Sequence, residues 1–369
     1  MVFAMCIALI ALPNNLKSQT VKAKREYTSD QEVFLTPDMN LAQAFRKISK
    51  STAVKQIVFA PGNYLVTDTL FLPRNRSLVI IEGQGANLKC NKNIPIFYSL
   101  PVDQSEAMIF TKTRYLIQNF GNIQGGSKGI FLGASFNTVI RNIEFIGQKE
   151  AAIDLVFCLM STIQEVLVTN VEHDGIVLRS AVDGETKKNE WPGTSFNNSQ
   201  CNHSVLKSCR VYNKKGCTGT SFKVLQSTGV RLEDCISEGW ANRRAVFFDA
   251  QKCTTAKLFK IQNFHLEHLP TEGAICLRGN GSIVEIDGLF LQHGEPESPA
   301  IWLMSNSNYT FKNIPWWPER AWVKSTHSPS IVITQCTYKF YDLKRWKNND
   351  KPGQPIYPNY IRTSDKLIR

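Results

Sequence analysis

The chain repeats one phrase of six residues, first as Gly129-Ile-Phe-Leu-Gly-Ala, then as Ala152-Ile-Asp-Leu-Val-Phe and Gly175-Ile-Val-Leu-Arg-Ser. Further copies begin at Ser221, Ala245, Ala274 and Ala300. A small residue takes the first place, and large apolar residues take the second and fourth. This alternation is the period of a β-strand with one buried face. Each phrase is therefore predicted to be a short strand.

The copies start 23, 23, 46, 24, 29 and 26 residues apart, a period typical of stacked repeats. A second apolar phrase follows most copies after nine or ten residues, as at Thr138 and Thr162, but it comes late, at His203, in the doubled interval. No helical segment between the phrases is long enough to cross over from one strand to the next. The pattern predicts an all-β fold, a single-stranded right-handed parallel β-helix whose equivalent residues stack about 4.8 Å apart.

Four regions are expected along the chain. Residues 1–35 form an apolar segment and linker, 36–55 a capping helix, 56–315 the β-helix with an insertion at about 181–200, and 316–369 a C-terminal strand and basic tail. The helix is predicted because four apolar residues share one face and Asp38 or Asn40 can cap it; the four are Leu41, Ala44, Phe45 and Ile48. That face should cover the open end of the solenoid, since bare strand edges promote aggregation.

The entry region resembles a known family. A helix leads into Phe59-Ala-Pro-Gly-Asn-Tyr, and a later strand ends in Ile81-Glu-Gly-Gln-Gly. This arrangement is similar to the entry coils of the pectate-lyase-like superfamily of right-handed β-helix proteins, which includes polysaccharide lyases, glycoside hydrolases and phage tailspikes. The resemblance spans roughly residues 36–315. It rests on turn and corner residues, so it implies the fold and little about chemistry.

The chain is basic, and the excess is concentrated at its end. It has 43 Lys and Arg against 31 Asp and Glu, a net charge of +12, and residues 344–369 hold seven basic and two acidic residues. Such a balance suits nucleic acid, an anionic membrane surface or an acidic polysaccharide. Because no nucleic-acid-binding motif accompanies it, we expect no nucleic acid partner. The tail is expected to be either disordered or a docking segment, for which an acidic partner is the candidate.

The apolar N-terminal run leaves two interpretations open. Val2 to Leu12 has the length of the apolar core of a signal peptide, but no Lys or Arg precedes it. It is too short to cross a bilayer core of about 30 Å as a helix. It is either a cleaved signal or a retained docking segment. We expect no transmembrane span and a location outside the cell or on a virion surface.

The ten cysteines show no CxxC pair, and no His cluster has zinc spacing. We therefore expect no metal site. Removal of Cys6 with a signal peptide would leave an odd number, which favours assembly in a reducing cytoplasm over a disulfide framework. Cys209 and Cys235 occupy equivalent places in adjacent coils, and Cys276 lies in a first-strand phrase. All three are expected to act as small apolar residues of the solenoid wall.

Places three and five of each phrase should face outward, on the side opposite to the core. They carry aromatic and charged residues, which together can hold sugar rings and uronate carboxylates. The expected binding surface lies beside the insertion and is overhung by Trp191. The candidate substrate-binding residues are Asp154, Arg179, Trp191, Lys223, Asp249, Arg278 and Trp302. The alternative is that loops or partner chains cover this face.

Catalysis would make specific demands on the same face. A lyase needs a base and a cation beside the uronate, and the candidates are Lys223, Arg179, His173, Asp174 and Asp249. A glycosidase needs two carboxyls at most about 9.5 Å apart. Asp154 and Asp249 are three coils apart, whereas Asp174 could pair with a carboxylate of the insertion: Asp183, Glu185 or Glu190. The acidic cluster of calcium-dependent lyases is missing, so we expect no cofactor, with Ca²⁺ only in the lyase case.

The absence of a recognisable catalytic cluster decides the functional expectation. We expect a surface-exposed, spike-, fibre- or tailspike-like protein that contacts cell-surface glycans, is non-catalytic or weakly catalytic, and forms a homo-oligomer such as a trimer. A secreted polysaccharide lyase or glycoside hydrolase is the first alternative. A purely structural assembly protein is the second.

Overall fold

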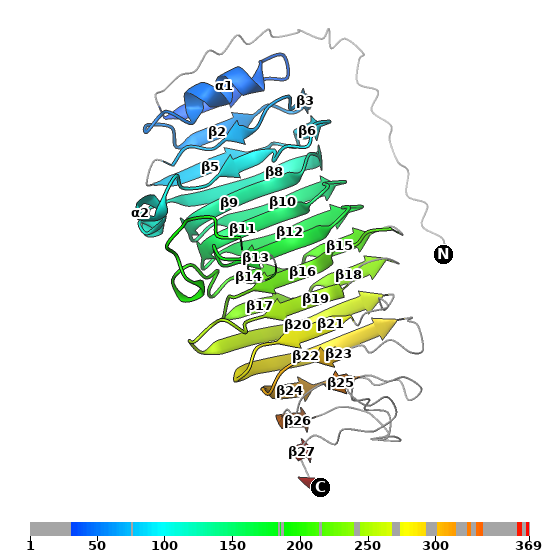
Figure 1. Ribbon diagram of the computed structural model, residues 1–369. Helices are drawn as coiled ribbons and strands as arrows, with labels where there is room; N and C mark the ends of the chain where they lie inside the picture. The colour runs from blue at the N-terminus through cyan, green and yellow to red at the C-terminus, as the bar shows by residue number, and fades with distance from the viewer. Residues whose placement is uncertain are drawn as a thin grey trace, which may run out of the picture.

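A computed structural model describes residues 31–74, 77–183, 185, 188–213, 216–239, 244–267, 274–292, 301–314, 323–325, 330–334, 360–363 and 367–368. The predictions for the apolar segment at 2–12, and for most of the basic tail, lie outside these residues. The described chain winds into a parallel β-helix of about 10 turns (Figure 1). The predicted fold class is confirmed.

The repeated phrases form one sheet of 10 strands, in which every neighbouring pair is parallel. Its strands are β4 (Leu70–Phe71), β7 (Phe97–Ser99), β9 (Lys128–Phe136), β11 (Ala151–Leu159), β13 (Asp174–Arg179), β16 (Thr220–Leu225), β19 (Arg244–Asp249), β21 (Ile275–Arg278), β23 (Ile301–Leu303) and β25 (Val323–Ser325). We call it the repeat sheet.

The remaining strands form a second sheet of 18 strands, here called the long sheet. They are β1 (Glu32–Leu35), β2 (Gln56–Phe59), β3 (Asn63–Leu65), β5 (Leu78–Glu82), β6 (Asn87–Cys90), β8 (Arg114–Gly125), β10 (Val139–Ile146), β12 (Thr162–Thr169), β14 (Val205–Lys207), β15 (Arg210–Asn213), β17 (Val230–Glu233), β18 (Ile236–Gly239), β20 (Lys257–Glu267), β22 (Ser282–Gln292), β24 (Asn308–Lys312), β26 (Ser330–Thr334), β27 (Tyr360–Thr363) and β28 (Leu367–Ile368). Among the described strand pairs of this sheet, only β27 with β28 is antiparallel.

A corner divides the strands of the long sheet into two stretches. At this corner Asn119, Asn142, Asn263 and Asn313 have φ between 49° and 60°, the left-handed region that asparagine tolerates well. The Asn142 side chain donates to the Asn119 side chain over 2.9 Å, so successive corners are also joined to each other. Each coil thus presents three faces to its surroundings.

The core of the solenoid follows the predicted inward places. The second-place residues stack in register and are fully buried: Ile153, Ile176, Phe222, Val246, Ile275 and Ile301. The first place is small because the backbone of the next coil approaches it closely. A Cβ at Gly175 would come within 2.4 Å of the Ser221 carbonyl oxygen. The alternation in the phrase therefore sets both the register and the packing.

The predicted capping helix is α1 (Leu41–Ile48), at the N-terminal end of the solenoid (Figure 1). Asn40 is the cap, since its side chain accepts from the Gln43 amide at 3.0 Å. Phe45 is buried against Phe59 and Phe97, with ring centroids 6.2 and 6.4 Å away. The strand β1, which we did not anticipate, pairs with β2 beside the helix.

Eight cysteines lie in the described part of the chain, and each has a free, buried thiol. Cys209 and Cys235 are fully buried, as expected for small apolar residues of stacked coils. Among the described residues, no helix is both long and apolar enough to cross a membrane.

Candidate functional site: the outer wall of the repeat sheet

The outward side chains of the repeat sheet form two columns, which we call the wall. The pairing register aligns the third places as Phe71, Tyr98, Phe131, Asp154, Val177, Lys223, Phe247, Cys276 and Trp302. It aligns the fifth places as Gly133, Val156, Arg179, Leu225, Asp249 and Arg278. The two columns predicted from the phrase therefore exist, and the charges in them meet across coils.

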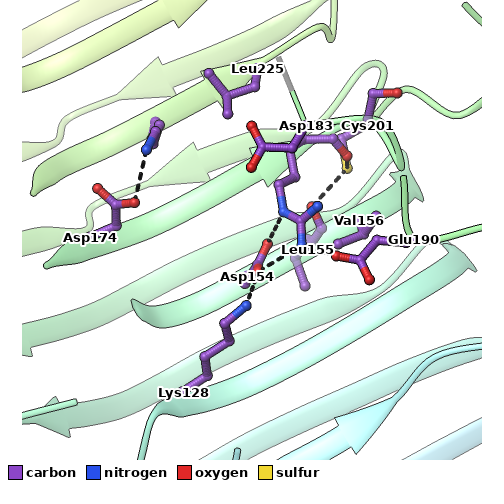
Figure 2. A network of polar contacts seen from close by, with 12 residues as sticks. Lys128, Asp154, Leu155, Val156, Asp174, Asp183, Glu190, Cys201 and Leu225 are labelled. Atoms are coloured by element: carbon purple, nitrogen blue, oxygen red, sulfur yellow. Dashed lines mark hydrogen bonds and ion pairs between the residues drawn. The ribbon is translucent and has the colours of Figure 1, made fainter. Parts of the chain in front are cut away.

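The first charged cluster is centred on Asp154. Its carboxylate accepts hydrogen bonds from Arg179 Nε at 2.9 Å, Arg179 Nη2 at 3.1 Å and Lys128 Nζ at 2.6 Å. Arg179 Nη2 also donates to Glu190 Oε1 at 2.9 Å. Lys128, Asp154 and Glu190 lie together on neighbouring elements in Figure 2. Two acids and two bases thus neutralise one another.

The electrostatics of this cluster favour the charged forms of Asp154 and Arg179. Burial alone would raise the pKa of Asp154, but Arg179 and Lys128 outweigh it and lower the pKa to about 2. Burial would lower the pKa of Arg179, yet the carboxylates of Asp154 and Glu190 raise it above its usual value. The Asp154 carboxyl is therefore ionised at any ordinary pH and cannot serve as a proton donor.

The second cluster joins the strand entrance to the insertion. Lys223 Nζ lies 3.1 Å from Asp174 Oδ2 and 2.7 Å from Glu185 Oε2. His173 Nδ1 lies 3.2 Å from the same Asp174 oxygen. Burial favours the neutral form of Lys223, but Asp174 and Glu185 raise its pKa overall. The hydrogen bond with Asp174 raises the pKa of His173.

The carboxylate pairs considered for a glycosidase are not arranged as an acid and a base facing a substrate. Asp174 and Glu185 do come together, but one ammonium group, that of Lys223, holds both. Despite its burial, Asp174 has a lowered pKa because of its contacts with His173 and Lys223. Asp183 accepts from the Glu185 backbone amide at 2.7 Å. Glu190 belongs to the first cluster instead.

The third cluster is the pair of Asp249 and Arg278, joined through Arg278 Nη2. Asp249 is buried, whereas the Arg278 side chain is 28% exposed. The guanidinium group lies 5.4 Å from the centre of the Phe247 ring, a cation–π distance. Beyond it, Trp302 is half-buried and packs beside Phe247 and Cys276.

The expected open groove beside the insertion is absent from the described structure. Asp154, Arg179 and Lys223 are 3%, 6% and 7% exposed, and Asp249 is 1% exposed. Trp191 does not overhang a groove, because it is itself 1% exposed. A role for these residues in holding substrate stays a prediction, and it would require the covering segment to move.

Trp191 is buried because the insertion folds down onto the wall. Its ring packs against Phe157, with centroids 6.3 Å apart, and its indole N–H donates to the Pro101 carbonyl at 3.2 Å. Gly133 leaves room for the ring, since a Cβ there would lie 2.8 Å from Trp191 Cζ2. A satellite core results, on the outer side of the sheet.

A second segment completes this cover. The sequence pattern there, Met108-Ile-Phe, predicts a strand, and this prediction is wrong because helical turns occupy these positions. The segment contains α2 (Gln104–Ala107) and the 3₁₀ turn η1 (Phe110–Lys112), while the insertion carries a second turn, η2 (Phe196–Asn198). Gln104 Nε2 donates to the Gly193 carbonyl at 3.1 Å and so ties the two segments together. The apolar residues Ala107 and Phe110 were the available signal, because they had no predicted partner.

Two places on the wall keep aromatic surface accessible. Phe71 is 45% exposed, and its ring meets that of half-buried Tyr98 edge to face, with centroids 5.4 Å apart. Tyr98 continues to Phe131, 5.5 Å away, which forms an aromatic column over three coils. At the other end of the wall, Trp302 is half-buried. The phrase pattern predicted Trp302 but gave no weight to Phe71 and Tyr98.

The only group of three close metal-ligand side chains within the described residues lies off the wall. It consists of Glu238, His265 and Glu267 on the long sheet. Sequence spacing concealed it, because Glu238 lies one coil away from the other two residues.

Comparison of the chain with models of known protein families gives no match, and comparison with curated proteins gives none either.

Proposed function

We propose that the protein is a non-catalytic β-helix surface protein that contacts glycans along the wall. One observation carries the non-catalytic part: the acids and bases expected to do chemistry there are held in buried ion pairs. Groups that neutralise each other inside a structure serve stability and positioning more readily than proton transfer.

A lyase is disfavoured by the state of its candidate base. A general base works best with a pKa near the working pH, so a lysine base needs a lowered pKa. The pKa of Lys223 is raised, because Asp174 and Glu185 outweigh the effect of burial. His173 is likewise stabilised in its protonated form by Asp174.

A glycosidase is disfavoured by the state of the carboxyls. Its general acid must stay protonated near neutral pH, which takes a raised pKa. The pKa values of Asp154 and Asp174 are both lowered by neighbouring cations, in spite of their burial. Neither could therefore supply a proton to a leaving group.

Glycan contact is supported by the accessible aromatic groups of the wall. Phe71 and Tyr98 offer adjacent ring surfaces, and a flat aromatic face is suited to the apolar side of a sugar ring. Trp302 and Arg278 combine a ring with a partly exposed guanidinium that could hold a uronate carboxylate. The contact surface would thus lie at the two ends of the wall rather than under the insertion.

We further propose that the chain is a divergent member of the pectate-lyase-like superfamily and acts as a homo-oligomer, such as a trimer, outside the cell or on a virion. The parallel β-helix supports this, as does the turn of Pro61 and Gly62 between β2 and β3. Most of the basic tail, lying outside the described residues, remains a candidate for contact with an acidic partner.

A glycan array tests the proposal directly. The full chain should give signal on a subset of glycans, and Phe71→Ala combined with Tyr98→Ala should weaken it. Phe290→Ala is a matched control, because Phe290 is also 45% exposed but lies on the long sheet. A double variant that binds like the unchanged chain would contradict this placement of the surface.

An activity assay on the same glycans separates binding from cleavage. We expect no new reducing ends and no unsaturated uronate absorbance. Turnover that is lost in Lys223→Ala would overturn the non-catalytic proposal in favour of a lyase.

A further inference from the structure

Three potential metal ligands converge on the long sheet, away from the wall. Glu238 comes from β18, and His265 and Glu267 come from β20. One ligand atom from each residue lies within 4.8 Å of the others. His265 Nε2 and Glu267 Oε1 are 3.1 Å apart.

The strand geometry explains why these side chains meet. His265 and Glu267 are two residues apart on one strand, so their side chains point to the same, outer face. Phe264, before His265, and Leu266, between the two, are buried on the inner face. Strand β18 pairs in parallel with β20, with Ser237 opposite Leu266. Glu238 is therefore opposite Glu267, one coil away.

The described residues offer this cluster little compensating positive charge. Elsewhere on the same sheet, Glu285 bridges Lys260 at 3.1 Å and Lys312 at 3.3 Å. Among the residues that the structure describes, none forms an ion pair with Glu238, and Glu267 pairs with His265. Two like charges placed directly opposite each other on neighbouring strands are destabilising. A bound cation would relieve that repulsion.

We propose that Glu238, His265 and Glu267 bind one divalent transition-metal ion, with zinc as the representative ion. Carboxylate and imidazole are both zinc ligands, and three protein ligands leave a position for water. The imidazole selects such ions over Mg²⁺ and Ca²⁺, which prefer oxygen ligands alone. This site is independent of glycan binding at the wall.

The surroundings of His265 hold its imidazole in place but leave it accessible to a metal ion. The ring of Phe290 packs against the imidazole, with centroids 4.7 Å apart, and so restricts its orientation. The His265 and Glu267 side chains remain 32% and 27% exposed. A hollow of about 260 Å³, lined in part by Asn263, His265 and Asn313, lies beside the cluster. An ion could enter from this side.

Calorimetric titration of the full chain with ZnCl₂, after removal of metals with a chelator, tests the proposal. We expect one ion bound per chain. Glu238→Gln and His265→Asn should each weaken binding by at least about 10-fold, since even the outer-shell partners of metal ligands contribute that much. Zinc should also raise the unfolding temperature of the unchanged chain but not of either variant.

Two control variants exclude general effects. His203→Asn removes another histidine, at a corner with φ of 54° that asparagine accepts, and should leave zinc binding unchanged. Glu144→Gln removes an outward carboxylate elsewhere on the same sheet and should do the same. All these variants keep the same cysteines, so zinc bound by thiols would be equal in all of them. A difference in zinc binding between variants would therefore come from the proposed site.

Several results would overturn the site. They are the absence of stoichiometric zinc binding, unchanged affinity in both ligand variants, or equal affinity for Ca²⁺ and Zn²⁺. The ligand side chains are partly exposed, so we expect the variants to fold, as circular dichroism can check. If one failed to fold, Glu267→Gln would take its place. A failure to detect glycans on the array would contradict the proposed glycan contact but would leave this zinc test unaffected.

Discussion

Asp154 illustrates how charges on a solenoid can be structural. Its carboxylate is almost inaccessible to solvent, and Arg179 and Lys128 contact it from the next coil and the previous one. Breaking a buried ion pair by removing one partner leaves the other charge uncompensated. The cluster therefore joins three coils. It stabilises the fold as long as each buried charge keeps its partner.

The first prediction concerns Asp154→Asn. It should reduce the free energy of unfolding by about 3 kcal/mol, near the lower end for buried pairs because Glu190 still faces Arg179. Glu150→Gln is the control, since Glu150 is 56% exposed and 3.7 Å from the same Lys128. Its cost should stay below about 1 kcal/mol in urea unfolding. Equal costs for the two variants would contradict a structural role for the cluster.

The second prediction is the pH dependence of this stabilisation. The folded-state pKa of Asp154 is about 2, below its reference value of 3.8, so the unfolded chain takes up the proton first as pH falls. The contribution, about 2 kcal/mol, is fully present above pH ~4 and is lost towards pH ~2. Urea midpoints of the unchanged chain and Asp154→Asn should therefore converge as pH falls from 5 to 2.5. A constant difference over that range would contradict the assigned pKa.

At the scale of elements, the insertion and the segment around α2 act as a cover for the wall. They meet each other through Gln104 and Gly193, and Trp191 contacts the sheet at Phe157 of β11. The cover buries charged side chains that an uncovered β-helix would expose. It thereby turns a surface suited to ligands into a second packed layer.

The third prediction tests this docking with Gly133→Ala. The added Cβ would lie 2.4 Å from Leu100 Cδ2 and 2.8 Å from Trp191 Cζ2, so overpacking should cost about 1–3 kcal/mol in unfolding free energy. Gly133→Ala should reduce the unfolding free energy by less when it is introduced into the Trp191→Leu variant, because the rigid indole ring is then absent. A double-mutant cycle in urea measures the difference. Identical costs in both backgrounds would mean that Trp191 does not occupy this position.

At the scale of the whole molecule, the solenoid has ends that need protection. Each coil is paired to the next, so unpaired strand edges occur only where the stack stops. At the N-terminal end, α1 places Leu41, Phe45 and Ile48 on the core, and β1 adds a strand beside it.

The fourth prediction is that deletion of residues 36–51 produces aggregated protein. Removal of the helix exposes the first coil and its apolar core, which can then pair with other chains. Light scattering should rise with protein concentration for the deletion but not for Lys47→Ala, an exposed position on the same helix. A folded, monomeric deletion product would show that the helix does not protect this end.

The sequence alone determined the fold, the register of the coils and the capping helix. A slip of one residue would turn the inward column of Ile153 and Ile176 towards solvent, so alternating burial permits one alignment only. Such information is local, because it repeats within each coil. It also identified which residues leave the core, including Asp154, Arg179 and Trp302.

Only the tertiary structure decided what happens to those outward residues. Trp191 contacts Pro101, 90 residues away, and Lys223 pairs with Asp174 across 49 residues. Glu238 meets His265 because β18 lies beside β20. No periodicity links such positions, since loops of unrelated sequence bring them together and the free energy of contact depends on geometry rather than on spacing. The wall could thus be located from the sequence, whereas its burial, its neutralised charges and the cluster on the other sheet could not.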